Sequence, residues 1–254
     1  MLIIKSRQIE ALARPGMERF EQALADHLRV AWPRECRLTG SDAALLHAIR
    51  RIIRAAQANG YETSRQLTLY AKIVFSLGIG FDTDPQLDWA ATALHDESID
   101  DPTERIERLY DEMVEYLGAV GGEDAGRIVR AMLRVRRYDF ATSPDTEGEA
   151  QVEDLCDVLE GFWPEKLAFQ EVSPTLAMVR EVIAKAARYG ITDPMGRCVF
   201  ATIGFIDGHD FDIDPLRPWA AAVLTDPSLG DGVARSQSLL AAGLNRMAQS
   251  LTRE

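Results

Sequence analysis

The sequence is poor in cysteine and lacks long apolar runs. Its three cysteines, Cys36, Cys156 and Cys198, are widely spaced. An odd number of scattered cysteines favours reduced thiols over a disulfide framework or a zinc site. No stretch reaches the length of about 18 apolar residues that a membrane span needs. The apolar start of MLIIKSRQIEAL is too short for a signal peptide, so we expect a cytoplasmic protein.

Positive charge is also in short supply. Lysine and arginine number 28 against 40 aspartates and glutamates, which gives a net charge of -12 at pH 7. Nucleic acids and anionic membranes are bound through clustered basic side chains. The composition therefore predicts neither as a partner. It is compatible with a protein partner that carries basic charge.

Motifs of the common catalytic sites are absent from the sequence as well. The four histidines do not have the spacing of zinc-protease ligands. We find no nucleophile elbow, phosphate-cradling glycine loop or Ser-x-x-Lys motif. The run from Asp207 to Asp214 resembles a calcium loop when counted from Asp210, but it fails at two required positions. Pro215 replaces the glycine and Ala221 replaces the bidentate glutamate.

The sequence does contain an internal repeat. Residues 60–109 align without a gap with residues 190–239, and 18 of the 50 aligned positions are identical. Roughly three identities are expected by chance. The clearest stretch reads FDTDPQLDWAATALHDES in the first copy and FDIDPLRPWAAAVLTDPS in the second. We interpret the chain as two copies of one helical unit.

Apolar residues recur with a helical period along most of the chain, which predicts an all-α fold. We expect two tandem helical bundles of about four to five helices each, related by a pseudo-twofold axis and joined by an extra helix. The first repeat would span residues 1–118 and the second residues 149–254. A basic helix and a polar linker would occupy residues 119–148. Because one repeat alone has a thin core, the bundles should pack face to face.

The repeated Asp-Pro pairs are expected to start short helices. Asp84-Pro85 and Asp214-Pro215 place an N-cap residue before a proline at the first helical position. A capping aspartate accepts hydrogen bonds from backbone N–H groups that otherwise have no partner, which stabilises a helix by about 1 kcal/mol. We therefore predict a structural role for these four residues.

Two further matched pairs have expected structural roles. Gly60 and Gly190 follow helical segments and suit the left-handed backbone at a helix end. Trp89 and Trp219 follow the Asp-Pro pairs and are expected to be buried in their bundles.

The doubled Asp-x-Asp motif has an alternative interpretation. Asp82 with Asp84, and Asp212 with Asp214, have a spacing that can bind a divalent metal in a hydrolase. The capping interpretation explains more, because it accounts for the prolines and for the presence of the motif in both copies. We therefore expect no metal, no cofactor and no catalytic residues, and keep a metal-dependent hydrolase as an alternative.

A basic helix is predicted between the copies, over about residues 123–140. Arg127, Arg130, Arg134 and Arg137 would form a docking face for an acidic partner on this helix. A solvated face, or pairing with the acidic surface of the same chain, is the alternative. The helix lies outside the repeat and is therefore the best place to look for a specific contact.

Most of both copies resembles a little-characterised family of bacterial cytosolic proteins, although the first copy departs from the family pattern at residues 57–61 and at Glu97. The resemblance is carried by Arg188-Tyr-Gly-Ile-Thr192, by Phe211-Asp-x-Asp-Pro-x-x-Pro-Trp-Ala220, by Leu224-x-Asp-Pro-x-Leu229 and by the opening MERFEQALADHLRVAWP. It implies a gene neighbourhood in type VI secretion islands, beside spike, spike-tip and effector genes. The family pattern consists of caps, prolines and tryptophans, and it provides no catalytic residues to transfer.

The resulting functional hypothesis is a non-enzymatic binding protein. Its partner would be a secreted effector, a toxin or a spike-tip protein, which it would hold as an adaptor or chaperone. An immunity protein that neutralises a cognate toxin is the alternative within the same class. The acidic charge would accelerate association with a basic toxin.

Overall fold

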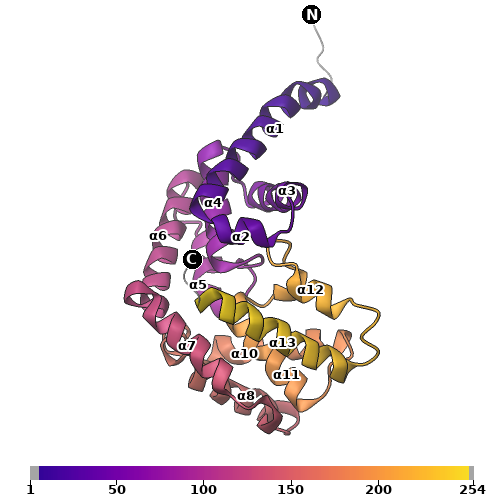
Figure 1. Cartoon of the computed structure of the whole chain (residues 1–254). Helices are drawn as coiled ribbons and strands as arrows, with labels where there is room; N and C mark the ends of the chain where they lie inside the picture. Colours follow the sequence, from indigo (N-terminus) through magenta and orange to yellow (C-terminus); the bar gives the residue numbers. More distant parts are fainter. Residues whose placement is uncertain (1–5, 252–254) are drawn as a thin grey trace, which may run out of the picture.

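The chain is helical throughout the part that the structure describes. The computed structural model describes residues 6–251 and contains no strand among them (Figure 1). The all-α prediction is therefore confirmed. No helix in this range is long and apolar enough to cross a membrane.

The first half of the chain contains six α-helices and one 3-10 turn. They are α1 (Ser6–Ala31), α2 (Pro33–Leu38), α3 (Asp42–Ala58), α4 (Ser64–Leu77), η1 (Pro85–Leu87), α5 (Asp88–Leu94) and α6 (Pro102–Gly121). A connecting region follows, with η2 (Glu123–Ala125), α7 (Gly126–Arg137) and η3 (Phe140–Thr142).

The second half again contains six α-helices. They are α8 (Gly148–Phe162), α9 (Pro164–Gln170), α10 (Val172–Arg188), α11 (Pro194–Asp207), α12 (Trp219–Leu224) and α13 (Gly232–Leu251), with η4 (Phe211–Ile213) before α12. The bounds of α3, α4 and α6 recur in α10, α11 and α13 with an offset of 130 at both ends. Helix positions therefore follow the sequence repeat, and the pseudo-twofold relation stays a prediction.

Side-chain caps fix where the repeated helices begin. Thr63 Oγ1 accepts a hydrogen bond from Gln66 N, and the Gln66 side chain accepts one from Thr63 N, which completes a capping box at the start of α4. At the start of α11, Asp193 Oδ1 accepts a hydrogen bond from Gly196 N at 2.8 Å. Gly60 and Gly190 follow the preceding helices with φ of +82° and +74°.

Two short helices were missing from the sequence prediction. They follow the Trp-Pro pairs at residues 32–33 and 163–164, where the proline is the first residue of α2 and of α9. Proline fits there because its fixed φ is helical and its missing N–H would have no partner in a first turn. Within the described residues each half therefore has six α-helices, against the four to five that the sequence predicts.

The Asp-Pro turns differ between the halves. In the first, η1 and α5 follow Asp84 directly. In the second, residues 215–218 form a non-helical turn and α12 begins only at Trp219, so the prediction of a helix from Pro215 was wrong. Pro218 explains the difference, because it has no N–H to donate and disfavours a helical backbone at the residue before it.

The basic helix between the halves is shorter than predicted. Helix α7 covers residues 126–137, and Tyr138 has an extended backbone. Asp139 Oδ1 then accepts a hydrogen bond from Ala141 N and caps a separate turn, η3. This local hydrogen bond to the Asp139 side chain competes with continuation of the helix to its predicted end at Phe140.

The two halves pack against each other through short elements. In Figure 1, α6 and α7 run down one side from the first half to the second. Helix α9 packs on α6, η1 packs on α10, and α7 contacts α6, α8 and α13. Trp163 Nε1 donates a hydrogen bond to Val120 O at 2.9 Å, which links α9 to α6. The missed helix α9 is therefore part of the contact between the halves.

We predict that Glu171→Gly stabilises the protein. Glu171 is the N-cap residue that precedes α10, and its φ of +65° and ψ of +169° lie in a backbone region that is essentially restricted to glycine and that costs other residues about 1–3 kcal/mol. Its partner in the repeat, Ser41, has φ -161° and caps α3 with its side chain. In urea unfolding, Glu171→Gly should raise the free energy of unfolding by about 1 kcal/mol, whereas the control Ser41→Gly should lower it slightly. A loss of stability in Glu171→Gly would contradict the assignment of strain.

Candidate functional site

The two Asp-x-Asp loops meet at the contact between the halves. A Cβ atom on Gly78 would lie 3.0 Å from the backbone oxygen of Asp207, and one on Gly208 would lie 3.6 Å from that of Leu77. Residues 77 and 78 of one copy therefore approach residues 207 and 208 of the other reciprocally. Glycine is required at both positions because φ is +101° at Gly78 and +98° at Gly208.

Asp84 is buried at this contact and is fully hydrogen-bonded. Its Oδ1 accepts a hydrogen bond from Gln86 N at 2.9 Å, and its Oδ2 accepts one from His209 N, also at 2.9 Å. The amide of Gln86 donates to both oxygens at 3.2 Å and to Gly204 O at 3.1 Å. Asp84 therefore caps its own turn and also binds the loop of the other half.

Asp214, the partner of Asp84 in the repeat, makes fewer contacts. Its Oδ1 accepts a hydrogen bond from Leu216 N at 2.8 Å. Its Oδ2 is buried without a hydrogen bond, and Arg217 Nη1 lies 3.8 Å away. Burial raises the pKa of Asp214 above its ordinary value, although Arg217 opposes that shift. Asp84 and Asp214 therefore differ in the number of hydrogen bonds that their carboxylates accept.

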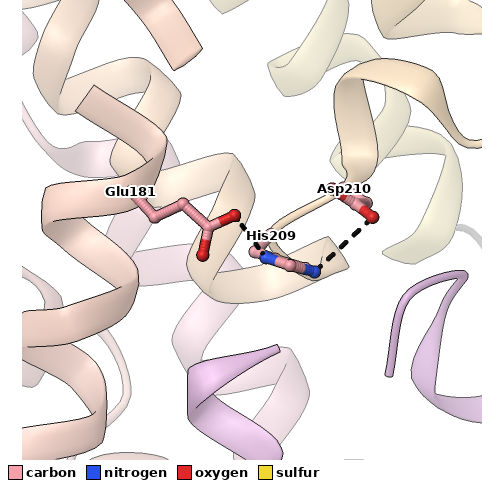
Figure 2. A group of neighbouring side chains, drawn as sticks. All are labelled: Glu181, His209 and Asp210. Atoms are coloured by element: carbon pink, nitrogen blue, oxygen red, sulfur yellow. Dashed lines mark hydrogen bonds and ion pairs between the residues drawn. The ribbon is translucent and has the colours of Figure 1, made fainter. Parts of the chain in front are cut away.

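A buried histidine lies beside this contact, between two carboxylates. Figure 2 shows the ring of His209 with Glu181 on one side and Asp210 on the other. Glu181 Oε1 is 2.9 Å from Nδ1 of the ring, and Asp210 Oδ2 is 3.5 Å from Nε2. Thr83 Oγ1, from the first half, is 3.3 Å from the same Nε2. Glu181, His209 and Asp210 form the only group with metal-ligand geometry that the described part of the chain contains.

The ammonium group of Lys185 contacts both carboxylates of this group. Its Nζ lies 2.5 Å from Asp210 Oδ1 and 3.1 Å from Glu181 Oε1, and it donates to His209 O at 2.9 Å. Burial opposes the charged form, but hydrogen bonds and ion pairs with Asp210 and Glu181 outweigh burial and raise the pKa of Lys185. The ammonium group forms ion pairs with both carboxylates, so we interpret the group as an internal ion-pair network.

A cavity of about 180 Å³ lies next to the buried Asp84, between the halves. We call it the Lys166 cavity. Its polar lining includes Asp84, Gln86, Tyr116 and Lys166. The apolar lining residues are Leu77, Leu87, Leu117, Val120, Ile128, Met132, Trp163 and Ile206. Several of them are only half-buried, so the cavity is not sealed from solvent.

Lys166, at the start of α9, is the unusual group in this cavity. The side chain is 5% exposed, and its Nζ donates a hydrogen bond to Phe205 O. The rings of Phe205 and Trp163 lie 4.7 and 5.5 Å from the nitrogen. Burial lowers the pKa of Lys166 to about 8, and the nearby carboxylates of Asp84 and Asp207 only partly offset this effect. A substantial fraction of the amine is therefore neutral near pH 8.

Two other polar residues that line the cavity have unused hydrogen-bonding capacity. Tyr116 accepts a hydrogen bond from Gln170 Nε2 at 3.1 Å, which leaves its own hydroxyl proton available. Burial, with a smaller effect from Asp84, raises the pKa of Tyr116 well above its ordinary value, so the hydroxyl stays protonated. The side-chain oxygen of Gln86 is buried without a hydrogen bond.

The predicted docking arginines are only partly free. Arg127 donates a hydrogen bond to Ala119 O, and Arg134 donates one to Phe162 O at 3.2 Å. Arg130 lies 3.7 Å from the carboxylate of Glu165. Arg137 is exposed and has no hydrogen bond or ion pair within the described part of the chain. Arg134 and Arg137 border a groove of about 360 Å³ whose other lining residues are Tyr138, Val158, Gly161 and Phe162.

The repeated tryptophans are half-buried, where full burial was expected. The ring of Trp89 lies 5.4 Å from that of Tyr116, and its Nε1 is buried without a hydrogen bond. The guanidinium of Arg246 lies 5.5 Å from the ring of Trp219. Both indoles pack against the hydrophobic core while part of each ring stays exposed.

Of the polar residues named in the lining of the Lys166 cavity, the sequence indicated a role only for Asp84. Lys166, Tyr116 and Gln86 belong to no motif and are distant in the chain. The only available signal was a lysine after Trp-Pro-Glu in an otherwise apolar segment, and that pattern is not specific.

Comparison with known protein families, curated proteins and solved structures finds no match to this chain. The family resemblance noted in the sequence therefore stays a prediction.

We predict that the two capping aspartates respond differently to amide substitution. In Asp84→Asn either orientation places an NH₂ group against N–H donors, which should cost about 2 kcal/mol for a buried site. In Asp214→Asn the amide oxygen can still accept the Leu216 N–H while NH₂ takes the place of the unpaired Oδ2, so we expect a cost below about 1 kcal/mol. Urea unfolding of both variants tests this, and equal losses would contradict the proposed asymmetry.

A second prediction concerns the pH dependence of stability. Because the pKa of Lys166 is about 8 in the folded chain and near its ordinary value when unfolded, the unfolded state binds more protons between these values. The free energy of unfolding should therefore rise with pH in this window, by about 2 kcal/mol between pH 7 and 9.5. Lys166→Met should lack this rise, and the difference between the two curves removes contributions of other groups. Parallel curves would show that the buried amine has an ordinary pKa.

Proposed function

We propose that this protein is a non-enzymatic binding protein that docks an acidic segment of a protein partner at α7. The observation that carries the proposal is the groove beside Arg134 and Arg137 on a chain with a net charge of -12. Helix α7 contains five arginines and no acidic residue, so it is a local exception on an acidic surface. Such a local exception favours an acidic partner at this face.

The groove combines charge with an apolar floor. Tyr138 and Phe162 meet edge to face, with ring centroids 5.1 Å apart, and Val158 adjoins them. An apolar side chain of a partner can be buried on these groups, while guanidinium groups at the rim bind carboxylates in a bidentate geometry. Interfaces of this kind derive most of their affinity from a few such aromatic and arginine contacts.

The identity of the partner is taken from the family resemblance. A chain of this type would hold a type VI secretion effector or spike-tip protein as an adaptor or chaperone. Immunity against a cognate toxin would use the same kind of surface, and survival on co-expression with the neighbouring toxin separates the two roles. An adaptor would not protect the cell.

The alternative of a metal-dependent hydrolase receives less support from the geometry. The four aspartates of the repeated motif have separate internal partners. Asp82 lies 3.5 Å from the Tyr70 hydroxyl and Asp212 accepts a hydrogen bond from the Tyr189 hydroxyl at 2.8 Å, while Asp84 and Asp214 bond to backbone N–H groups. None of the four belongs to the single group with metal-ligand geometry among the described residues.

We predict that charge reversal on α7 abolishes partner binding. The tagged protein, Arg134→Glu/Arg137→Glu and the control Arg54→Glu, which changes an exposed arginine on α3, would each be used to capture proteins from the native lysate. A secretion component should be recovered at least tenfold less with the double variant than with the other two, because its carboxylates would meet like charges. Equal recovery would place the interface elsewhere. Recovery of no secretion component by the unaltered chain would contradict the proposed context.

A further inference from the structure

We propose that the Lys166 cavity binds a small carbonyl compound and that the Lys166 amine forms an imine with it. The inference rests on three features that meet there: a buried amine, an accessible cavity with apolar walls, and unused polar groups that can orient a carbonyl. It is independent of the docking function proposed for α7.

The size and lining of the cavity define the ligand class. A volume of about 180 Å³ exceeds the roughly 150 Å³ of an apolar cavity that accommodates benzene, so a short aliphatic or single-ring molecule fits. Leu117, Val120, Ile128 and Met132 would contact its apolar part. The polar part would lie beside Lys166, because Asp84 is close enough to act electrostatically on both Lys166 and Tyr116, and Gln86 is hydrogen-bonded to Asp84.

Lys166 is suited to attack a carbonyl carbon. A neutral amine is the nucleophile, and the low pKa makes it available near neutral pH. The Lys166 nitrogen adds to the carbonyl carbon, the adduct loses the former carbonyl oxygen as water, and a C=N bond replaces the C=O bond. Both hydrogens of the neutral amine leave with that water, so the step needs neither an oxidant nor a reductant.

Tyr116 and Gln86 supply complementary hydrogen-bonding groups. The hydroxyl of Tyr116 retains a proton that can be donated to the carbonyl oxygen as negative charge develops there. The unpaired side-chain oxygen of Gln86 can accept a hydrogen bond from the addition intermediate or from the departing water. Without a ligand or water, this buried oxygen has no hydrogen-bond partner, which is unusual for a native interior.

The chain contains its own comparison amines. It has four lysines: Lys5, Lys72, Lys166 and Lys185. Lys185 is also largely buried, but its ion pairs with Asp210 and Glu181 raise its pKa and keep it protonated. Lys72 is half-buried on α4, with its nitrogen 5.9 Å from the Tyr110 ring. A selective reaction at Lys166 therefore cannot be attributed to exposure.

Reductive alkylation with butanal and sodium cyanoborohydride tests the inference. The reductant traps the imine as a secondary amine, and peptide mass spectrometry locates it. At pH 7.5 we expect Lys166 to be alkylated at least ten times faster than Lys72, with a rate that rises through about pH 8, and Lys185 to be the slowest of the three. In urea, which unfolds the chain, the three rates should become similar.

Two variants make the result specific. Met132→Trp fills the cavity without touching the amine and should slow alkylation of Lys166 at least tenfold while circular dichroism and the melting temperature stay near those of the unaltered chain. Lys72→Met is the matched control and should leave the Lys166 rate unchanged. Alkylation of Lys166 no faster than that of Lys72 in the folded chain would overturn the proposal. Fast alkylation that persists in a folded Met132→Trp protein would overturn the assignment to this cavity.

Discussion

The contact between the two halves depends on how a buried carboxylate is satisfied. Asp84 is removed from water at the point where the loops of both copies meet, and a buried charge without partners would be far too costly to keep there. Hydrogen bonds from its own turn and from His209 N of the opposite loop remove that cost. One side chain therefore caps the start of the η1 turn and also holds the loop of the other half.

The two copies share helix bounds and capping residues, but they differ in several charged or titratable residues. Helix bounds and capping aspartates recur at the offset of 130 residues, because every copy must satisfy the same backbone groups at its helix ends. In contrast, His209 and Asp207 are matched by Ile79 and Leu77 in the first copy. Lys166 is matched by Glu35 when the Trp-Pro pairs are aligned. The His209 network and the Lys166 cavity therefore arise from divergence between the copies.

This division also explains what could be predicted from the sequence. The Asp-Pro pair is a local pattern that predicts an N-cap, and Asp84 accepts a hydrogen bond from Gln86 N, only two residues further along the chain. Helix α9 was missed because seven residues are too few to show a helical period. Lys166, Tyr116 and Gln86 come together only through the packing of α9 and η1 between the halves, and no local pattern encodes that meeting. Trp89 and Trp219 are less buried than predicted, because a repeated tryptophan in the sequence does not reveal whether its helix lies inside the core or at its edge.

Helix α7 connects the two proposed binding regions. Its inward side chains Ile128 and Met132 line the Lys166 cavity, while Arg134 and Arg137 border the outer groove. A rigid helix of this length cannot shift at one face without shifting at the other. A partner that moved α7 on docking would therefore change the shape of the cavity, and by thermodynamic reciprocity a ligand in the cavity would change the affinity for that partner. The one long helix outside the repeat thus offers a direct physical route by which the two sites could be coupled.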